Sequence, residues 1–492
     1  MMFLLKKVFR VLLSGFLVVI IVQGLHGCAT VGPDYNPPQT QVPAKWHAPQ
    51  REGLTVKDAF PQNLTAWWTN LNDPALSALI ERAAKGNLDL KKAVARVREA
   101  RARRGLSRAE LFPTLDASGS VIRSRGSRNS GGNTTRDAYE IGLDASWELD
   151  IFGGVRRSIE AAEADLQAGG EDFRDVLVSL FAEVALNYTE LCTARTRLAV
   201  ANESLHAQQE TYRLTQWRYQ AGLDDELAVQ QSLYSLESTR SQIPSLQTAI
   251  SEAKNRLAVL LGERPGVLSA ELDIDRTIPA PPLEIAIGIP ADVLRQRPDV
   301  RRAERQLAAQ TARIGVAEAE LYPKLKLSGA IGLDAFSIGG LFSFDAGSAS
   351  GGFGITWRVF DAGAIRRNIE VQSAVQEQYL IAYESAVLAA LEEAENALFA
   401  YAEEQKRRRS LLEASRAAEQ ARDLARMKYE AGLTDFGDVL DAERSLLNFR
   451  DQLAQSDGSV ATDLIKIYKA MGGGWTLLAP DEEKLSANGD KS

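Results

Sequence analysis

The pentapeptide YQAGL at residues 219–223 recurs as YEAGL at residues 429–433, an offset of 210 residues. Two longer blocks keep the same offset without a gap: RRGLSRAELFP at 103–113 returns as RIGVAEAELYP at 313–323, and WELDIFGGVRRSIE at 147–160 returns as WRVFDAGAIRRNIE at 357–370. A fixed offset over such separated blocks indicates that the chain is a duplication of one structural unit.

Within each copy the hydrophobic period changes from that of a helix to that of a strand and back. Ala, Leu, Arg and Glu dominate residues 74–111, which predicts a helix that ends before Pro113. Apolar and polar residues alternate at 137–150, which predicts a strand with one apolar and one polar face. The same alternation occurs around 115–121, 325–333 and 353–359. Four strands of about ten residues have the length of tilted membrane strands.

Each strand pair is followed by a helical stretch that no Pro interrupts, residues 153–219 and 363–429. At 1.5 Å per residue, roughly 65 residues reach about 100 Å, far beyond the size of a globular core. A heptad-like apolar seam in the first stretch predicts lateral packing against neighbouring helices. A shorter helix returns after each turn, so the first repeat covers 74–261 and the second 291–471, with a Pro-rich connector at 262–290.

The first 27 residues have the order of a bacterial export signal, a basic stretch followed by an apolar run. The run is about a dozen residues, shorter than the roughly 20 that cross a bilayer as a helix, so we expect its removal. Cys28 follows a small residue, as the acylated Cys does in the lipobox of bacterial lipoproteins. The alternatives are an uncleaved anchor or an ordinary signal with a chance Cys. Residues 28–73 would then form a lipidated N-terminal segment, and residues 472–492 a flexible C-terminal tail.

Composition argues against several classes of function. Loss of the three basic residues of the signal would lower the net charge from −8 to −11, and such an acidic surface argues against nucleic acid as a partner. Lipidation of Cys28 would leave Cys192 without a disulfide partner. His26 lies in the signal, and His47 and His206 belong to no cluster of nucleophiles or metal ligands. We therefore expect no enzyme, no cofactor and no metal site.

The number of strands sets the size of the assembly. Four membrane strands leave two open edges whose backbone groups lipid cannot satisfy, so one chain cannot form a pore alone. Two chains would give eight strands, and side chains fill a barrel of that size. Three chains give twelve strands, enough for a polar lumen, and supply the helices for a long tube beneath it.

Short motifs accompany the duplicated frame in a fixed order: VGPDY at 31–35, WW at 67–68, DP at 73–74, RPDVR at 297–301 and the paired turns. This order resembles the outer-membrane efflux proteins of the TolC and OprM type, in particular their lipoprotein branch, over nearly the whole chain after Cys28. The resemblance implies a mixed α and β membrane protein. Its trimeric twelve-stranded β-barrel, four strands per chain, continues into a long periplasmic α-helical barrel. The terminal segments and the connector would build an equatorial region.

The resemblance also implies the function and the partners. A homotrimer would act as a passive duct that exports small molecules from a periplasmic adaptor protein and an inner-membrane efflux pump to the exterior. The protein would be lipid-anchored in the outer membrane and extend into the periplasm, with no cofactor besides the lipid on Cys28. Within this class, the alternative is a duct for peptide or protein secretion. A purely structural periplasmic lipoprotein would explain the helices but not the four alternating strands.

The two helical turns are expected at the periplasmic end of the molecule, about 100 Å from the barrel. The residues that form these tips and that we expect the adaptor to contact are Tyr219, Gly222, Leu223, Tyr429, Gly432 and Leu433. At the other end of the helices, Trp147 and Trp357 suit either the interfacial aromatic belt or simple packing at the strand ends.

Asp438 and Asp441 are three residues apart and therefore share one helix face. By spacing from Gly432, both match the constriction motif of the family that the chain resembles. Three copies would form a ring of six carboxylates, a periplasmic gate that favours cations. The alternative is helix-start chemistry, with Asp435 as N-cap and Asp438 in the first turn. Thr434 stands where some relatives place a basic residue that locks the tip, so we expect no ionic latch at that position.

Overall fold

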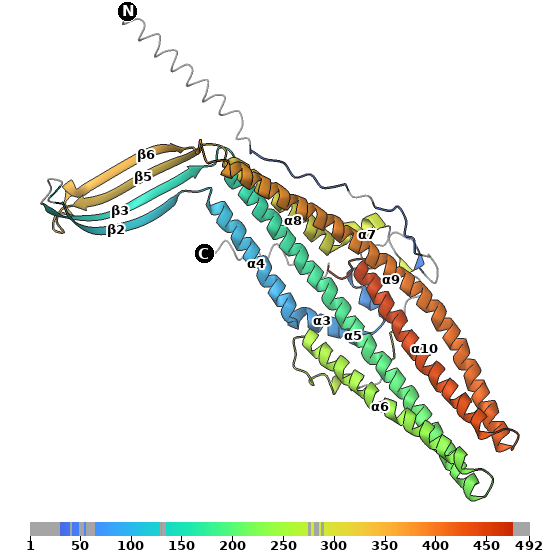
Figure 1. Ribbon diagram of the computed structural model, residues 1–492. Helices are drawn as coiled ribbons and strands as arrows, with labels where there is room; N and C mark the ends of the chain where they lie inside the picture. Colours follow the sequence, from blue (N-terminus) through green and yellow to red (C-terminus); the bar gives the residue numbers. More distant parts are fainter. Residues whose placement is uncertain are drawn as a thin grey trace, which may run out of the picture. The chain divides into compact units, whose positions relative to one another are not determined.

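The computed structural model describes residues 30–39, 42–48, 54–55, 64–127, 129, 134–273, 277–279, 285–286 and 290–475. The predicted signal peptide, Cys28 and residues 476–492 of the predicted tail lie outside the described residues. The elements follow in this order (Figure 1): β1 (Leu54–Thr55), η1 (Trp67–Leu71), α3 (Pro74–Gly86), α4 (Leu88–Ala109), β2 (Thr114–Arg125), β3 (Thr135–Leu149), α5 (Gly154–Gln220), α6 (Glu226–Leu260), η3 (Glu271–Asp273), β4 (Ile285–Ala286), α7 (Pro290–Gln296), α8 (Pro298–Ala319), β5 (Lys324–Ala335), η4 (Phe344–Ala346), β6 (Gly347–Thr356), α9 (Ala364–Glu430) and α10 (Phe436–Ala470).

The chain divides into two compact units. The first combines Met1–Gln39, Val97–Gly169 and Arg302–Tyr383, and it contains the large sheet. Its four strands lie in the order β2-β3-β5-β6, and all neighbours are antiparallel (Figure 1). The edges of this sheet are β2 and β6, whose residues are almost all exposed. Among the described residues neither edge has a further partner strand.

The duplication is visible in the pairing of the strands. In the first hairpin Thr114 lies opposite Ser146, and in the second Lys324 lies opposite Thr356. Each residue of the second pair stands 210 positions after its counterpart in the first. The predicted repeat therefore preserves strand register.

The two strand-end tryptophans repeat the same contact. Nε1 of Trp147 donates to the Leu111 carbonyl at 2.9 Å, and Nε1 of Trp357 donates to the Leu321 carbonyl at 3.0 Å. Each indole thus ties a strand to the end of the helix that precedes the hairpin. Trp357 is 56% exposed, and the choice between the two predicted roles stays a prediction.

The fourth strand differs from its prediction. Alternation predicts a strand that reaches Val359, but β6 covers Gly347–Thr356. Its partner β5 begins at Lys324, directly after Pro323, and Lys324 is the residue opposite Thr356. Beyond Thr356 the strand has no pairing partner among the described residues, so the regular pairing ends there.

The long helices agree with the sequence. Helices α5 and α9 each contain 67 residues, and the returning helices α6 and α10 each contain 35. One 18-residue window of α5 is apolar enough to cross a membrane by length and composition alone. That window is 61% buried, as is common in a core helix, and it is weak evidence for a membrane span.

The helix predicted over residues 74–111 is instead two helices, α3 and α4, separated at Asn87. Asn87 is buried, and its Nδ2 donates to the Leu260 carbonyl at 2.8 Å while its Oδ1 accepts the Leu90 N–H at 2.9 Å. The end of α6 also packs so closely that a Cβ on Gly86 would lie 2.0 Å from the Leu261 oxygen. Tertiary packing against α6 therefore breaks the helix and caps α4.

The second unit combines Thr40–Arg96, Gly170–Arg301 and Glu384–Ser492. An aromatic cluster in this unit consists of Trp67, Trp68, Phe181 and Tyr468, with the Trp67 and Tyr468 rings stacked 5.2 Å apart. Strands β1 and β4 pair in parallel, which joins the N-terminal segment to the connector. Buried Arg297 donates to the Ala470 carbonyl at 2.7 Å and so closes the end of α10.

Candidate functional site

The two helical turns have the same backbone conformation. Gly222 and Gly432 have φ angles of +71° and +70°, in the left-handed region that favours glycine. The N–H groups of Leu223 and Leu433 each bond at 2.8 Å to the carbonyl five residues earlier, which closes the helix ends. The predicted sharp reversals at both glycines are confirmed.

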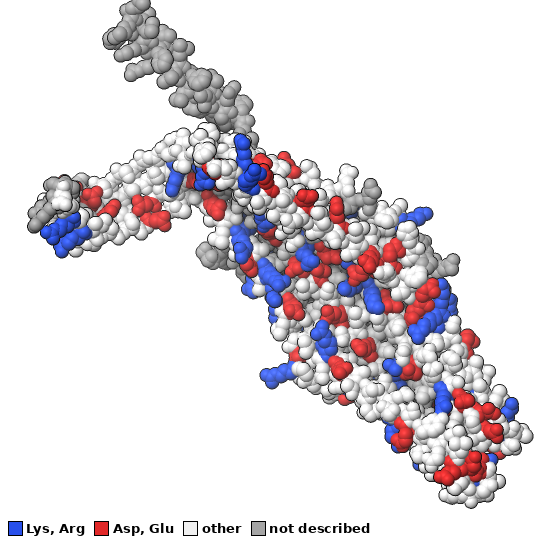
Figure 2. Space-filling model, in the orientation of Figure 1, with Lys and Arg blue, Asp and Glu red and all other residues white. Residues whose placement is uncertain are grey.

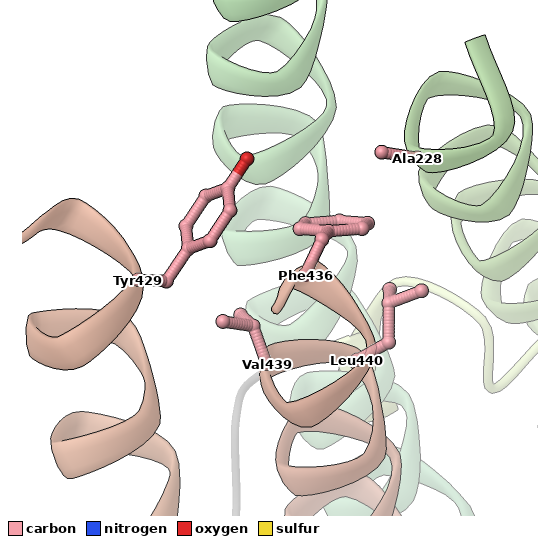
Figure 3. Packing of buried hydrophobic residues seen from close by; sticks show 5 residues of the cluster. All are labelled: Ala228, Tyr429, Phe436, Val439 and Leu440. Atoms are coloured by element: carbon pink, nitrogen blue, oxygen red, sulfur yellow. The ribbon is translucent and has the colours of Figure 1, made fainter. Parts of the chain in front are cut away.

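An apolar cluster joins the two helical hairpins, α5 with α6 and α9 with α10, close to their turns. Tyr429 at the end of α9 packs with Phe436, Val439 and Leu440 at the start of α10, and Ala228 of α6 belongs to the same cluster (Figure 3). All five are at most 7% exposed, and the Tyr429 and Phe436 rings lie 5.4 Å apart. The residues of the second turn are therefore held against the first hairpin by burial.

Three polar side chains, those of Arg218, Asp224 and Tyr429, also connect the two helical hairpins. Nε of Arg218 lies 2.9 Å from Oδ2 of Asp224, the Tyr429 hydroxyl donates to the same carboxylate, and the Arg218 guanidinium lies 4.6 Å from the centre of the Tyr429 ring. The hydrogen bond to Asp224 raises the pKa of Arg218, and burial together with the Asp224 carboxylate raises the pKa of Tyr429. Both residues keep their protons throughout the physiological range, so the cluster is a permanent ionic contact.

The tip residues expected to contact an adaptor separate into two groups. Leu223, Leu433 and Tyr219 are 66%, 76% and 46% exposed. Tyr429, the repeat counterpart of Tyr219, is only 3% exposed because it holds the hairpins together. Figure 2 shows charges of both signs interspersed along the helical surface, with acidic side chains gathered near the ends of the hairpins. Exposed leucines beside acidic residues give the tips a mixed apolar and negative surface.

Asp438 and Asp441 lie on the exposed side of α10, while Val439 and Leu440 between them are buried. The Thr434 hydroxyl donates to Asp438, and Oδ1 of Asp441 lies 3.8 Å from Nη1 of Arg444. The exposed face is where a pore-lining carboxylate has to be, and the Thr434 bond is helix-start chemistry. Their role as a gate remains a prediction.

The N-cap alternative is weaker than expected at Asp435. Its backbone has the extended conformation of an N-cap, but its side chain makes no capping hydrogen bond among the described residues. In the first repeat, by contrast, Oδ1 of Asp225 accepts the Ala228 N–H at 3.0 Å. The start of α10 is thus capped less completely than the start of α6.

A buried carboxylate lies next to the tips on α10. Glu443 is 8% exposed and accepts the Thr211 hydroxyl at 2.8 Å through Oε1, whereas its Oε2 has no hydrogen-bond partner among the described residues. Gln208 Oε1 is likewise unpartnered there, and both residues line a cavity of about 30 Å³. Burial raises the pKa of Glu443, although the Thr211 hydroxyl and the Arg422 and Arg426 guanidiniums lower it.

The segment that follows Cys28 is held within the first unit. Arg157 on α5, whose side chain is 4% exposed, donates to the Val31 and Gly32 carbonyls at 3.0 Å and pairs with Asp34 at 2.8 Å. The Tyr35 hydroxyl bonds to Glu304 of α8 at 3.2 Å. The VGPDY motif is therefore a docked segment.

Among the described residues no group of three or more His, Cys, Asp or Glu side chains could hold a metal ion. Cys192 is buried and forms no disulfide among the described residues.

Known proteins share the repeated architecture of this chain. The family model described as Outer membrane efflux protein matches residues 79–263 and again residues 289–473, two matches 210 residues apart. The chain belongs to the outer-membrane efflux protein family.

Relatives and solved structures extend the similarity over the chain. The chain is 31% identical to Nodulation protein T of Rhizobium leguminosarum bv. trifolii over 461 residues, which cover 92% of this chain and 96% of that protein. It is also 31% identical to the cation efflux system protein CusC of Escherichia coli O6:H1 over 458 residues, again 92% and 96%. The structure of the outer-membrane channel OprN superposes with a TM-score of 0.86 at 37% identity, covering 91% of this chain and all of that one.

These findings confirm the predicted family and fold class, in which each chain of a trimeric channel contributes a four-stranded sheet and long helices. The protein is an efflux channel of the outer membrane that extends into the periplasm. Its family is one of channels rather than of enzymes.

Proposed function

We propose that three copies of this efflux channel form one duct, whose periplasmic end receives substrate from a periplasmic adaptor and an inner-membrane pump. The observation that carries the proposal is the open sheet, with exposed edges at β2 and β6. In lipid, unpaired strand edges leave backbone N–H and C=O groups without partners at a cost of several kcal/mol each. Three copies provide twelve strands, enough to close a barrel around a polar lumen.

Purification from native membranes in mild detergent tests the assembly. We expect a native mass of three chains, discrete conductance steps in planar bilayers, and co-elution of an adaptor and a pump. A stable monomer would contradict the trimer, whereas a conducting trimer that never co-elutes with an adaptor or pump would contradict only the proposed partners.

The helical tips are the surface that we propose for the adaptor. Leu223 and Leu433 project at the two turns, 66% and 76% exposed, and isolated apolar side chains at such a site suit a helical hairpin with apolar positions of its own. The gate role of Asp438 and Asp441 belongs to the same proposal, because spreading of the tips by an adaptor would widen a ring of carboxylates.

The substrates are proposed to be small molecules, with peptide or protein secretion as the alternative. Two relatives of equal identity to this chain bear names that refer to nodulation in one case and cation efflux in the other. A conduit that selects little fits this spread, since selection then rests on the pump.

We further propose that Cys28 carries the lipid anchor. Cys28 precedes by three residues the docked segment at Val31, which Arg157 fixes to the unit that holds the barrel strands. Cys28→Ser should abolish labelling by a clickable palmitate analogue while the strands still insert, because the sheet does not depend on the thiol. Persistent labelling of folded Cys28→Ser protein would exclude this residue as the anchor.

A further inference from the structure

We propose that β6 of one copy pairs antiparallel with β2 of the next copy in one defined register, with Phe353 opposite Val121 of the partner subunit and Arg358 opposite Asp116 of the partner subunit. The proposal rests on the trimeric duct proposed above and specifies how its subunits join.

The two repeats pair their strands in the same register. The two hairpins of the sheet have equivalent pairings, since Thr114 faces Ser146 and, 210 residues later, Lys324 faces Thr356. The remaining seam within one chain joins β3 of the first repeat to β5 of the second. The seam between chains has to join β6 of the second repeat to β2 of the first, so it is the counterpart of the β3–β5 seam.

The register of the β6–β2 seam follows if each residue of the β3–β5 seam is replaced by its counterpart in the other repeat, 210 positions away. Leu143 of β3 faces Ile331 of β5. The position 210 residues after Leu143 is Phe353, and the position 210 residues before Ile331 is Val121. The same transfer converts the Trp147 and Leu327 pair into Trp357 and Ala117.

A charge pair supports this register independently. Glu148 lies opposite Lys326 in the register of the β3–β5 seam, while its ion pair is with Lys324 at 3.9 Å. The transferred positions of the opposite pair hold Arg358 and Asp116. The two seams thus carry opposite charges at equivalent places with the signs exchanged, which favours the pairing in both cases. Asp116 also lies opposite Asp144 inside its own chain, so a cation on its other side would offset a like-charge contact.

Alternative registers lose these features. A shift by one residue would place the apolar side chains of β6 on the polar face of β2, because strand side chains alternate with a period of two. A shift by two keeps the faces but moves Arg358 opposite Thr114 or Ser118, neither of which is charged. Among the described residues no salt bridge of Arg358 or Asp116 is seen, although backbone hydrogen bonds and, with them, the charge of Arg358 lower the pKa of Asp361 in its own chain.

A helix position points to the same neighbour. Gly315 on α8 is needed because a Cβ there would lie 2.8 Å from Cγ of Arg157. At its counterpart Gly105 on α4 a Cβ would meet none of the described residues within 4 Å, although glycine inside a helix costs about 1 kcal/mol relative to alanine. The counterpart of Arg157 is Arg367, whose side chain is 79% exposed. The transfer places Arg367 of one copy against Gly105 of the partner subunit, which accounts for the glycine.

The same seam accounts for the early end of β6. Opposite β2 of the partner subunit, residues 357–359 gain the backbone hydrogen-bond partners that β5 lacks. The strand then extends to Val359, as the alternation predicts.

Cysteine pairs introduced into the full-length protein test the register in outer membranes. Residues directly opposite have Cβ atoms about 4.5–5.5 Å apart, while diagonal neighbours are about 7–8 Å apart, beyond disulfide reach. Hydrogen-bonded and non-hydrogen-bonded pairs alternate along the seam, so one pair of each kind is used: Phe353→Cys with Val121→Cys, and Thr356→Cys with Ser118→Cys. The matched controls shift one partner by two residues, to Gly119→Cys or Arg123→Cys with Phe353→Cys, and each single variant is included.

Copper-phenanthroline oxidation followed by non-reducing electrophoresis is the readout, with native mass measured on the same preparations. We expect at least one of the two in-register pairs to give covalent dimer and trimer bands about fivefold stronger than either shifted pair. A shifted pair that links as well or better, or no link from either in-register pair in particles of three chains, overturns the register and leaves the trimer intact. Particles of any other mass overturn the trimer itself.

A charge exchange provides the second test. Arg358→Asp alone should lower the temperature at which the trimer dissociates on semi-native gels, because it sets two carboxylates opposite each other, and adding Asp116→Arg should recover at least half of that loss. A double variant that dissociates at the same temperature as Arg358→Asp, or lower, would exclude the contact between Arg358 and Asp116 of the partner subunit.

Discussion

The contribution of Glu443 to stability depends on pH, because its carboxyl is 8% exposed and has one hydrogen-bond partner, the Thr211 hydroxyl, among the described residues. Its pKa is raised by burial above the ordinary value for Glu, about 4.3 in the unfolded chain. A group with a raised pKa in the folded state contributes its full stability below the unfolded pKa, and this contribution is lost as the pH rises through the folded pKa. The unpartnered Oε2 then carries charge inside the helical packing near the tips.

Glu443→Gln should therefore stabilise the detergent-solubilised protein at pH 8, by about 1 kcal/mol, since it removes a buried charge and keeps the size of the side chain. It should also flatten the decline in thermal midpoint that we expect of the unchanged protein as the pH rises above the ordinary pKa of Glu. Circular dichroism of the helices measures both. Glu413→Gln, on an exposed carboxylate of α9, is the matched control and should follow the unchanged protein. Parallel pH curves for all three proteins would show that Glu443 is already neutralised by another group.

At the scale of the elements, the period of the sequence predicts those features that depend on one element alone. The lengths of α5 and α9 and the reversals at Gly222 and Gly432 follow from local signals. The prediction is wrong where another element decides. The break at Asn87 results from its bond to the end of α6, and β6 stops where β5 begins.

The candidate site shows the same limit. The turns and the Asp438 and Asp441 pair are visible as short motifs, but the contact between Arg218, Asp224 and Tyr429 joins two turns that lie about 200 positions apart in the chain. The repeat hides this contact further, because Tyr219 and Tyr429 occupy equivalent positions while only Tyr429 is buried. Asp224 directly after the first turn is the residue in the sequence that could have indicated this ionic contact, because Thr434 occupies the equivalent position after the second turn. The ionic contact is therefore at the first turn, whereas from the sequence we considered only the second turn, where Thr434 argued against one.

At the scale of the whole molecule, the repeats supply unequal charge to the tips. The positions 210 residues before Asp438 and Asp441 are Ala228 and Gln231, so only the second repeat brings carboxylates to this helix face. Three copies would therefore give six carboxylates rather than twelve. If they line the lumen, partial exclusion of water strengthens their field and counter-cations gather between them.

Asp438→Asn combined with Asp441→Asn tests this ring by removing six charges from a trimer while keeping side-chain size. Asn still accepts a hydrogen bond at a helix start, so folding should change little, by a fraction of a kcal/mol. The reversal potential in a salt gradient across a planar bilayer should move toward the value of an unselective pore, and block by multivalent cations should weaken. Glu226→Gln with Glu430→Gln removes the same number of charges near the same turns and is the matched control, expected to leave the reversal potential close to that of the unchanged channel. If both double variants shift it equally, the general negative charge of the tips sets the selectivity. An unchanged potential in well-folded Asp438→Asn, Asp441→Asn trimers would show that the two carboxylates serve the start of α10 and do not form a ring.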